Sequence, residues 1–321
     1  MVIHYPLLFE PVFKKMIWGS ESWDITCRPE EMGIIKNGSA TGLTFRAYID
    51  QDPTGVLGTR ITGDFPLLVK IIDARDTLSV QVHPPDDYST DPGKSEMWYI
   101  ITPPTDGELI IGLAPNATSQ IENHLNRLAV KTGDIINIPA GLVHALTPGA
   151  KIAEVQQNSD TTYRIYDYNR VGPDGKPRQL HIEDALAVAD FANTIPKTTV
   201  PGLCIENDNC IKTYTIANKY FGIIKYEISG KINETSNPEA FSIFTCVEGE
   251  AEINGVKIQT EQSIFIPANL GEYTIKPGKN CKLLKAFVPN IKTDFIEPLL
   301  KNNHTYEEII KNLAIEIDSP A

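Results

Sequence analysis

The sequence predicts a mainly β chain built from two similar domains, and three observations lead to this prediction. The chain has 321 residues, which is about two domains at the usual length of roughly 150 residues each. Its 23 Pro and 22 Gly are spread along the sequence, which indicates many turns between short strands. A short β-like unit around Pro139 also recurs around Pro267. Because Thr, Pro and Gly gather near residues 193–210, we expect domains at 1–203 and 204–321.

Charge and cysteine content narrow the class of protein. The formal net charge is −12 and no basic run offsets it, which argues against a nucleic-acid partner but not against an anionic small molecule in a basic cleft. Five cysteines without a CxxC pair are typical of reduced thiols. The N-terminus does not resemble a signal peptide, and no apolar run approaches the roughly 18 residues that span a bilayer. We expect a cytoplasmic monomer that binds neither nucleic acid nor membranes.

Periodicity places strands and a few short helices along the chain. Residues 65–73 are nearly all apolar apart from Lys70, which is typical of a central strand. Residues 78–83 alternate, with Ser79 on the same face as Gln81. Helical spacing predicts helices at 182–191, 118–129 and 306–315, the last capped at Thr305. Further strands are expected at 97–101, 134–158, 221–228, 241–247, 251–258, 263–266 and 281–288.

Four side chains would meet at one point if their segments are strands of one barrel. Gln81 and His83 share a strand face, Glu96 opens the next strand, and His144 follows a Pro-x-Gly turn. A lone histidine on a strand is more often a core or surface residue. The chain has only six histidines, however, and two of them stand at these positions. Two imidazoles, a carboxylate and an amide oxygen suit a borderline divalent metal such as zinc. We expect the remaining histidines to be structural or exposed: His4, His124, His181 and His304.

The second copy of the β-unit has lost its imidazole. When the two copies are aligned so that Pro139 matches Pro267, His144 matches Glu272. Both copies then continue into a Pro-Gly turn. No histidine occurs between His181 and His304. The sequence therefore predicts one metal site per chain, in the first domain.

The segment Gly-x5-Pro-x-Gly-x-x-His that ends at His144 resembles the second motif of the cupin superfamily. Cupins are antiparallel jelly-roll barrels that carry a metal in the barrel mouth. Gln81-x-His83 departs from the usual His-x-His of the first motif. The resemblance implies two cupin-like antiparallel jelly-roll barrels with a few short helices.

Several segments together resemble type I mannose-6-phosphate isomerase in its short bacterial form. They are 13–19 (FKKMIWG), 78–84 (LSVQVHP), 94–99 (KSEMWY), 138–144 (IPAGLVH) and 154–164 (EVQQNSDTTYR). The resemblance implies that Gln81, His83, Glu96 and His144 bind one Zn²⁺, that Arg164 is catalytic and that Lys94 lines the site. The long helical insertion of the eukaryotic enzymes is missing, so its contacts are not carried over.

That family interconverts mannose 6-phosphate and fructose 6-phosphate through a cis-enediol, which assigns roles to further residues. Arg164 suits a developing oxyanion or a phosphate because its guanidinium stays charged. Lys94 lies near the metal and is the candidate base. Asp160 would orient Arg164 or assist ring opening, and Ser79 would contact the sugar phosphate. A lysine within an apolar strand needs a partner, so Lys70 is expected to bind either the substrate phosphate or a buried carboxylate.

Two other classes of function stay open on the residues alone. An iron-dependent cupin oxygenase would use more imidazole ligands than Gln-x-His supplies. A non-catalytic sugar-sensing cupin would have lost its ligands in both domains. No P-loop and no GxGxxG after a strand is present, so a nucleotide-dependent reaction is not supported.

Overall fold

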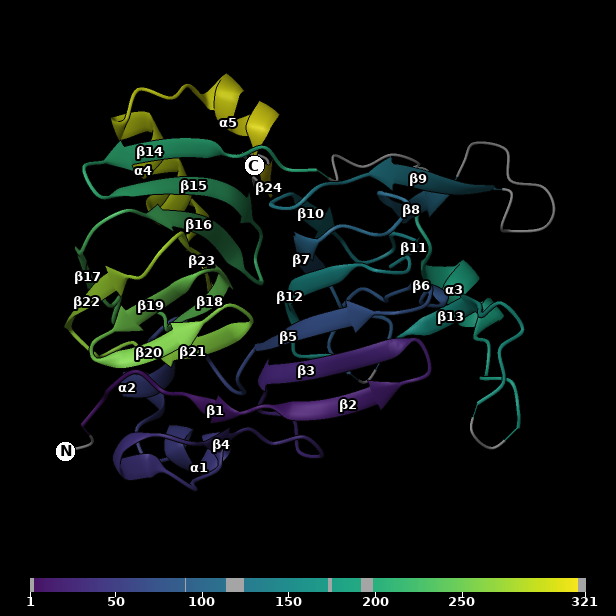
Figure 1. Cartoon of the computed structure of the whole chain (residues 1–321), viewed down its shortest axis with the longest axis horizontal. Helices are drawn as coiled ribbons and strands as arrows, with labels where there is room; N and C mark the ends of the chain where they lie inside the picture. Colours follow the sequence, from purple (N-terminus) through teal and green to yellow (C-terminus); the bar gives the residue numbers. More distant parts are fainter. Residues whose placement is uncertain (1–2, 90, 114–123, 173–174, 192–198, 317–321) are drawn as a thin grey trace. The chain divides into compact units, whose positions relative to one another are not determined.

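The chain folds into two compact units, described here from a computed structural model (Figure 1). The structure describes residues 3–89, 91–113, 124–172, 175–191 and 199–316. We call Phe13–Ser22 with Lys70–Thr199 the central unit, and Met1–Val12 with Trp23–Val69 and Val200–Ala321 the flanking unit. Within the described ranges, no helix is long and apolar enough to cross a membrane.

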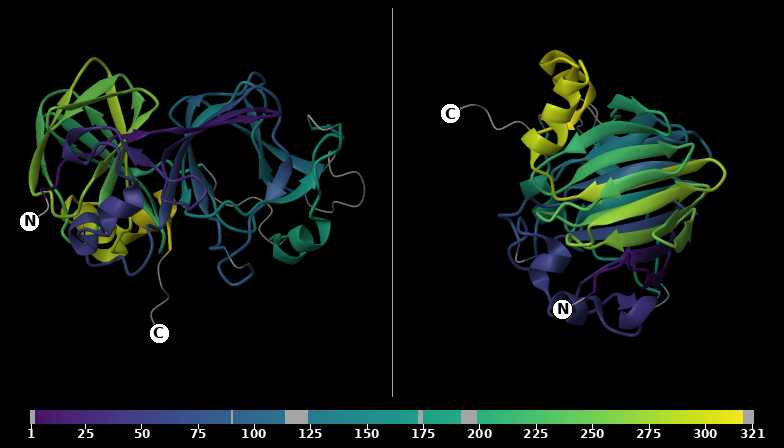
Figure 2. Two further views of the ribbon diagram at one scale, coloured as in Figure 1. Left: turned by 90° about the horizontal axis from the view of Figure 1, so that it is seen from below. Right: turned by 90° about the vertical axis from the view of Figure 1, so that its left-hand side faces the viewer.

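The central unit is built on two sheets with a core between them. Figure 2 shows that the sheets curve around an interior. The first sheet has the order β10 (Ile135–Ile138), β7 (Glu96–Thr102), β12 (Lys151–Gln157), β5 (Leu67–Ala74), β3 (Gly19–Ile25) and β2 (Val12–Met16). The second has the order β13 (Tyr163–Tyr166), β6 (Val80–Val82), β11 (His144–Ala145), β8 (Glu108–Leu113) and β9 (Leu125–Ala129).

Side-chain alternation explains how β6 presents its polar face. Val80 and Val82 are fully buried in a small core cluster, while Gln81 between them is half-buried and faces the opposite side. The expected alternation of residues 78–83 is confirmed. Strand β5 is buried along nearly its whole length, as an apolar run predicts for a central strand.

The flanking unit repeats the two-sheet plan. One sheet has the order β14 (Leu203–Asn207), β15 (Cys210–Ala217), β16 (Gly222–Ile228), β23 (Cys281–Phe287), β18 (Ser242–Glu248) and β21 (Gln262–Ile266), and β24 (Ala314–Ile315) pairs with β15. The other has the order β17 (Ile232–Thr235), β22 (Glu272–Pro277), β19 (Glu250–Ile253) and β20 (Val256–Gln259). The mainly β prediction with two jelly-roll domains and few short helices is confirmed.

The N-terminal segments belong to the flanking unit, which differs from the expected division at 1–203 and 204–321. Leu7 N donates to Phe265 O at 2.8 Å, and the rings of Phe45 and Phe65 pack on that of Phe265. This aromatic core joins residues that are distant in the sequence, so no local composition change marks the division. The segment also contains β1 (Phe9–Glu10), β4 (Ile34–Ile35), η1 (Gly38–Ala40), α1 (Phe45–Ile49) and α2 (Pro53–Leu57).

Two of the three expected helices are present, and the third prediction is wrong where it can be compared. The first two are α3 (Ile182–Val188) and α5 (Tyr306–Asn312), and Thr305 caps α5 with a capping box as expected. The third prediction, 118–129, fails because Leu125–Ala129 is strand β9, which β8 holds by antiparallel pairing. Residues 118–123 lie outside the described ranges. The described part of the chain also contains η3 (Lys292–Ile296) and α4 (Glu297–Lys301).

The internal repeat is visible in a shared turn. Leu142 N donates to Pro139 O at 3.2 Å after β10, and Leu270 N donates to Pro267 O at 3.2 Å after β21. The two copies then diverge at the ligand position, because His144 is fully buried whereas Glu272 is exposed.

Candidate metal centre and active site

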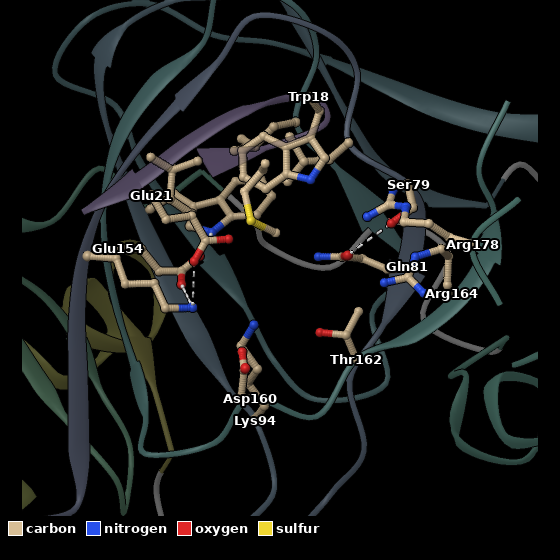
Figure 3. Close-up of a pocket in the computed structure, with 16 residues that line it drawn as sticks. Trp18, Glu21, Ser79, Gln81, Lys94, Glu154, Asp160, Thr162, Arg164 and Arg178 are labelled. Atoms are coloured by element: carbon tan, nitrogen blue, oxygen red, sulfur yellow. Dashed lines mark hydrogen bonds and ion pairs between the residues drawn. The ribbon is translucent and has the colours of Figure 1, made fainter. Parts of the chain in front are cut away.

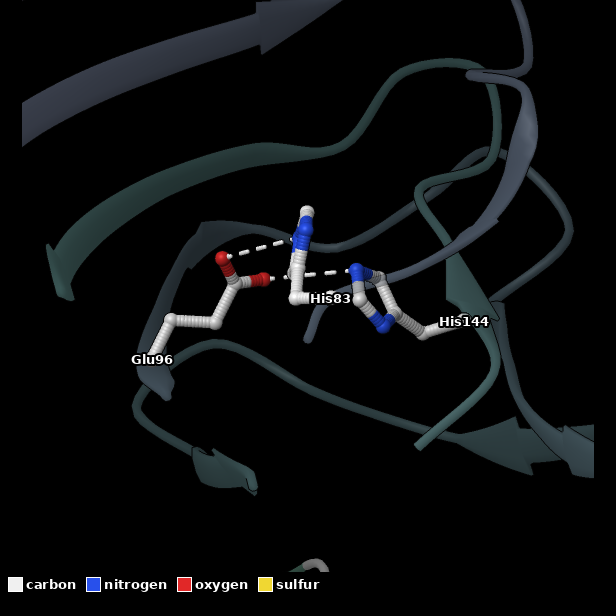
Figure 4. Close-up of side chains that lie close together, drawn as sticks. All are labelled: His83, Glu96 and His144. Atoms are coloured by element: carbon white, nitrogen blue, oxygen red, sulfur yellow. Dashed lines mark ion pairs between the residues drawn. The ribbon is translucent and has the colours of Figure 1, made fainter. Parts of the chain in front are cut away.

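Three buried side chains of the central unit come together at one point (Figure 4). His83 lies directly after β6, Glu96 is the first residue of β7, and His144 is the first residue of β11. One ligand atom of each lies within 4.8 Å of the others, and all three side chains are buried. In the described part of the chain this is the one group of three or more His, Cys, Asp or Glu residues with such spacing.

Backbone carbonyls fix both imidazoles in the orientation that a metal ligand needs. His83 Nδ1 lies 3.0 Å from Thr161 O, and His144 Nδ1 lies 2.8 Å from Leu142 O. Each Nδ1–H can therefore donate a hydrogen bond to a carbonyl, which turns the lone pair of Nε2 toward the cluster, where Lys94 Nζ lies 3.1 Å from His83 Nε2. Both Nε2 atoms face Glu96, at 3.4 Å from one carboxylate oxygen each.

The protonation states also suit a metal. Burial, reinforced by the Lys94 ammonium, lowers the pKa of His83 to about 3, and burial likewise lowers the pKa of His144. Burial opposes ionisation of Glu96, but the Lys94 ammonium 3.1 Å from Oε2, together with His83 and His144, outweighs burial and holds the pKa of the carboxyl well below its usual range. The ligands are thus neutral imidazoles and a carboxylate, the forms that bind cations.

The buried carboxylate of Glu96 provides a direct test of whether a metal fits. Among the described residues, neither of its oxygens accepts a hydrogen bond, although both are buried. Buried polar atoms in folded proteins nearly always have such partners. The two carboxylate oxygens lie between the Nε2 atoms of two imidazoles, with the Lys94 ammonium as the ion-pair partner of Oε2, and this donor arrangement suits a divalent cation.

Gln81 supplies a fourth group to this cluster. It is the cross-strand partner of His144, and its Nε2 lies 3.3 Å from His144 Nε2. The amide oxygen is the atom that would bind a metal, and a half-turn of the amide exchanges it with Nε2. Ser79 Oγ lies 3.4 Å from that oxygen.

A polar cavity of about 240 Å³ opens beside the cluster (Figure 3). Six residues expected at the site line it: Lys70, Ser79, Gln81, Lys94, Asp160 and Arg164. Figure 3 shows Glu21 and Glu154 at one end of the cavity, and Arg164 and Arg178 at the other end beyond Ser79 and Gln81. The cavity therefore has an acidic end and a basic end.

Lys70 belongs to the acidic end. Its Nζ lies 3.4 Å from Glu154 Oε1 and 3.7 Å from Glu21 Oε2. The expected partner was either the substrate phosphate or a buried carboxylate, and the structure shows carboxylates. Trp98 Nε1 donates to Glu154 Oε2 at 2.9 Å. One ammonium faces two carboxylates, and burial together with the nearby Glu96 charge raises the pKa of Glu154 to about 7.

Arg164 and Arg178 form the basic end. Arg164 is the cross-strand partner of Gln81, and its Nη1 donates to Gln179 O at 2.9 Å. Among the described residues its guanidinium makes no hydrogen bond to Asp160, which lines the cavity and donates its backbone N–H to Asp91. Burial and the neighbouring Arg178 charge lower the pKa of Arg164.

The sequence did not point to Arg178, Glu21 or Glu154. The only signal for Arg178 is a basic residue after Pro177, which is equally typical of an exposed turn. Hydrogen bonds within the protein hold the imidazoles of three further histidines, as expected of structural residues: His4 to Asp52, His181 to Arg164 and His304 to Cys204.

This fold and its buried cluster define a cupin with a candidate metal site in the central unit. A family model described as phosphomannose isomerase type I, catalytic domain, matches residues 9–121, and one described as mannose-6-phosphate isomerase, cupin domain, matches residues 210–288. The chain belongs to the type I mannose-6-phosphate isomerases, a family of enzymes.

Individual relatives agree with this membership. The chain is 34% identical over 313 residues to mannose-6-phosphate isomerase ManA of Bacillus subtilis, covering 86% of this chain and 97% of that protein. It is 32% identical over 261 residues to a mannose-6-phosphate isomerase of Streptococcus mutans, covering 71% and 80%. The crystal structure of the mannose 6-phosphate isomerase from B. subtilis superposes with a TM-score of 0.77 at 30% identity, covering 88% of this chain and 99% of that one.

Proposed function

We propose that this chain interconverts mannose 6-phosphate and fructose 6-phosphate with one zinc ion held in the central unit. The observation that carries the proposal is the buried His83–Glu96–His144 cluster beside a cavity with a basic end. The names of the relatives supply mannose 6-phosphate, and fructose 6-phosphate is the ketose that isomerisation between its first two carbons would give. The cavity is lined by residues of the central unit, and we propose that the chain acts on this small molecule as a monomer.

Gln81, His83, Glu96 and His144 would hold the metal. Two imidazole nitrogens, a carboxylate and an amide oxygen form a mixed donor set that suits zinc better than the harder magnesium or calcium ions. Bound there, zinc would supply Lewis-acid polarisation of the oxygens on the two carbons between which the proton moves.

The basic end of the cavity is suited to the phosphate. Guanidiniums bind phosphate oxygens through charge-assisted hydrogen bonds, and Arg178 lines this end, while Arg164 is the cross-strand partner of the proposed metal ligand Gln81. With the phosphate there, the sugar would extend past Gln81 toward Glu154 (Figure 3). Ser79 and Asp160 line the same cavity and offer hydrogen-bonding groups to its hydroxyls.

Proton transfer requires a group that can both accept and release a proton near neutral pH. The carboxyl of Glu154 has this property, because its pKa is raised to about 7 and it lines the cavity. Lys94, whose Nζ lies 3.1 Å from both Glu96 Oε2 and His83 Nε2, is placed beside the metal ligands. Both residues are candidates for moving the proton, and Arg164 would stabilise negative charge that develops on the substrate.

The test combines metal analysis with a coupled assay for fructose 6-phosphate. The purified chain is expected to contain one zinc, to lose activity under a chelator and to recover it when zinc is returned. A protein fully loaded with metal that leaves mannose 6-phosphate unchanged would remove the proposed activity. Iron in place of zinc, with oxygen consumption, would point to an oxygenase instead.

A further inference from the structure

The segment that follows β13 carries an arginine clamp centred on Asp167. The carboxylate is 5% exposed and accepts hydrogen bonds from two guanidiniums. Arg178 Nε donates to Oδ2 at 2.7 Å and its Nη2 donates to Oδ1, so the contact is bidentate. Arg170 Nη2 donates to the same Oδ1. One carboxylate therefore fixes two arginines.

The backbone around the clamp adopts an uncommon shape. Tyr168 and Asn169 are both left-handed, with φ of 54° and 53°, and Arg170 N donates to Asp167 O at 3.0 Å across them. A bulky residue such as Tyr rarely adopts this conformation. It persists only where the surrounding contacts hold it, so its presence marks a turn whose shape is maintained by the clamp.

Arg170 connects this turn to the strand that lines the cavity. Its Nη1 donates to Thr77 O, two residues before the cavity residue Ser79. Its guanidinium also lies over the ring of Tyr168, with Cζ 5.4 Å from the ring centroid. The clamp is thus tied to the wall that carries Gln81.

Of the three residues that form the clamp, Arg178 is the one that lines the cavity. Asp167 occupies its Nε–Nη2 edge, and the guanidinium lines the cavity together with that of Arg164. Figure 3 shows both on the side of Ser79 and Gln81. Three guanidiniums, those of Arg164, Arg170 and Arg178, face the carboxylate of Asp167 and the more exposed carboxylate of Asp76, which lies 3.5 Å from Arg170 Nη1. This end of the cavity therefore keeps an excess of positive charge that the negative charge of a phosphate would balance.

We propose that Asp167 is a positioning residue for phosphate recognition: through its bidentate contact it holds Arg178 in the orientation that binds the phosphate of the sugar phosphate. The proposal rests on the proposed function for the identity of the substrate. It assigns no chemical step to Asp167, because the carboxylate contacts arginines and not the cavity.

The test uses Asp167→Asn in the zinc-loaded enzyme, since asparagine keeps the shape of the side chain and removes its charge. The KM for mannose 6-phosphate and the Kd for inorganic phosphate, measured by calorimetry, are both expected to rise about tenfold, while kcat stays within about twofold. A purely structural role would lower kcat or the amount of folded protein without this joint rise. Unchanged KM and phosphate Kd would overturn the proposal.

A double-mutant cycle separates the clamp from general effects. Arg178→Ala is expected to weaken phosphate binding on its own, and adding Asp167→Asn should then change the Kd by less than about twofold. Independent, additive losses would contradict the assignment. The matched control is Asp106→Asn, which removes an exposed Asp–Arg pair with Arg127 in the same unit and should leave both constants unchanged.

A second variant and a binding measurement that does not depend on turnover complete the test. If Asp167→Asn does not fold, Arg178→Lys serves instead, because lysine keeps the charge and loses the bidentate contact; the same rise in phosphate Kd is expected. Phosphate binding needs no turnover. A wild-type protein that binds phosphate through the clamp but leaves mannose 6-phosphate unchanged would remove the proposed function alone, whereas normal turnover with unaltered phosphate binding in the variants would remove the clamp alone.

Discussion

Arg164 and Gln81 lie directly opposite each other in strands β13 and β6, and His144 of β11 lies opposite Gln81 on its other side. Cross-strand partners point to the same face of a sheet. A guanidinium, an amide and an imidazole therefore form one row across three strands. Arg164 and the candidate metal ligands Gln81 and His144 are close, but each side chain is positioned by its own strand. Substitution of Arg164 should therefore leave the candidate metal site intact.

Substitution of His144 by Ala should abolish metal binding. The change removes one of two imidazoles from a fully buried site, and we expect the zinc affinity to fall by more than about 100-fold. Metal content after dialysis, measured by mass spectrometry, checks this. The control is His304→Ala, whose imidazole contacts Cys204 O in the flanking unit. A His144→Ala protein that keeps one zinc would exclude the cluster as the metal site.

Substitution of Arg164 by Ala should leave the metal in place and remove turnover. We expect kcat to fall by about 100- to 1000-fold, because a cation that stabilises developing charge is lost. The coupled assay and the metal content are measured on the same preparation. Arg127→Ala, which removes an exposed arginine of the central unit, is the control. Normal turnover in Arg164→Ala would show that the arginine has no catalytic role.

Gly141→Ala should loosen both imidazoles together. Gly141 has φ of +85°, a Cβ there would lie 3.0 Å from Val188 O, and its N–H donates to His83 O at 2.9 Å. We expect a loss of about 1–2 kcal/mol in unfolding free energy, and also weaker zinc binding. Gly107→Ala isolates the effect, since φ is +75° but a Cβ meets nothing within 4 Å. Equal zinc affinity in the two variants would argue against a role of this turn in ligand placement.

Glu154 should make the stability of the protein depend on pH. Its pKa is about 7 in the folded chain against an ordinary value of 4.5, so between these values the folded protein keeps a proton that the unfolded chain has lost. The stability from this proton is present below about pH 4.5 and is lost as the pH rises through 7. Glu154→Gln should therefore gain on the order of 1–3 kcal/mol relative to the wild type between pH 4.5 and 8.

Urea denaturation at several pH values measures this difference. The surface variant Glu297→Gln is expected to follow the wild type at every pH. A constant difference between Glu154→Gln and the wild type from pH 4.5 to 8 would contradict a proton on Glu154.

Strand alternation and motif spacing were sufficient to predict that His83, Glu96 and His144 lie together as a candidate metal site. Gln81 and His83 could be placed on one face by the period of a strand, and the turn before His144 carried its own signature. The need of Lys70 for a partner was equally visible, because one charge stood in an apolar run. Its actual partners were not, since Glu21 comes from a strand that only the sheet order brings beside β5.

The basic end of the cavity could not be predicted for a similar reason. Asp167, which holds Arg178, is followed by two left-handed residues, neither of them glycine, and no composition rule predicts that shape. The helix expected over 118–129 failed at Leu125–Ala129 because pairing with β8 overrides local helical spacing. Local sequence patterns predicted the features that depend on a single strand. The features that depend on pairing between distant segments could not be predicted from them.

Gln81 and His144 touch across the sheet although 63 residues of chain separate them. Contacts between residues so distant in the sequence are expected to form late in folding, because the entropic cost of closing the long loop comes before the stabilisation that the contact provides. If the cluster binds zinc as proposed, metal uptake should consequently appear only when the two sheets of the central unit have assembled. During refolding, metal uptake would report when the central unit is fully folded. A folding intermediate that precedes this step would be recognised because it does not bind the metal.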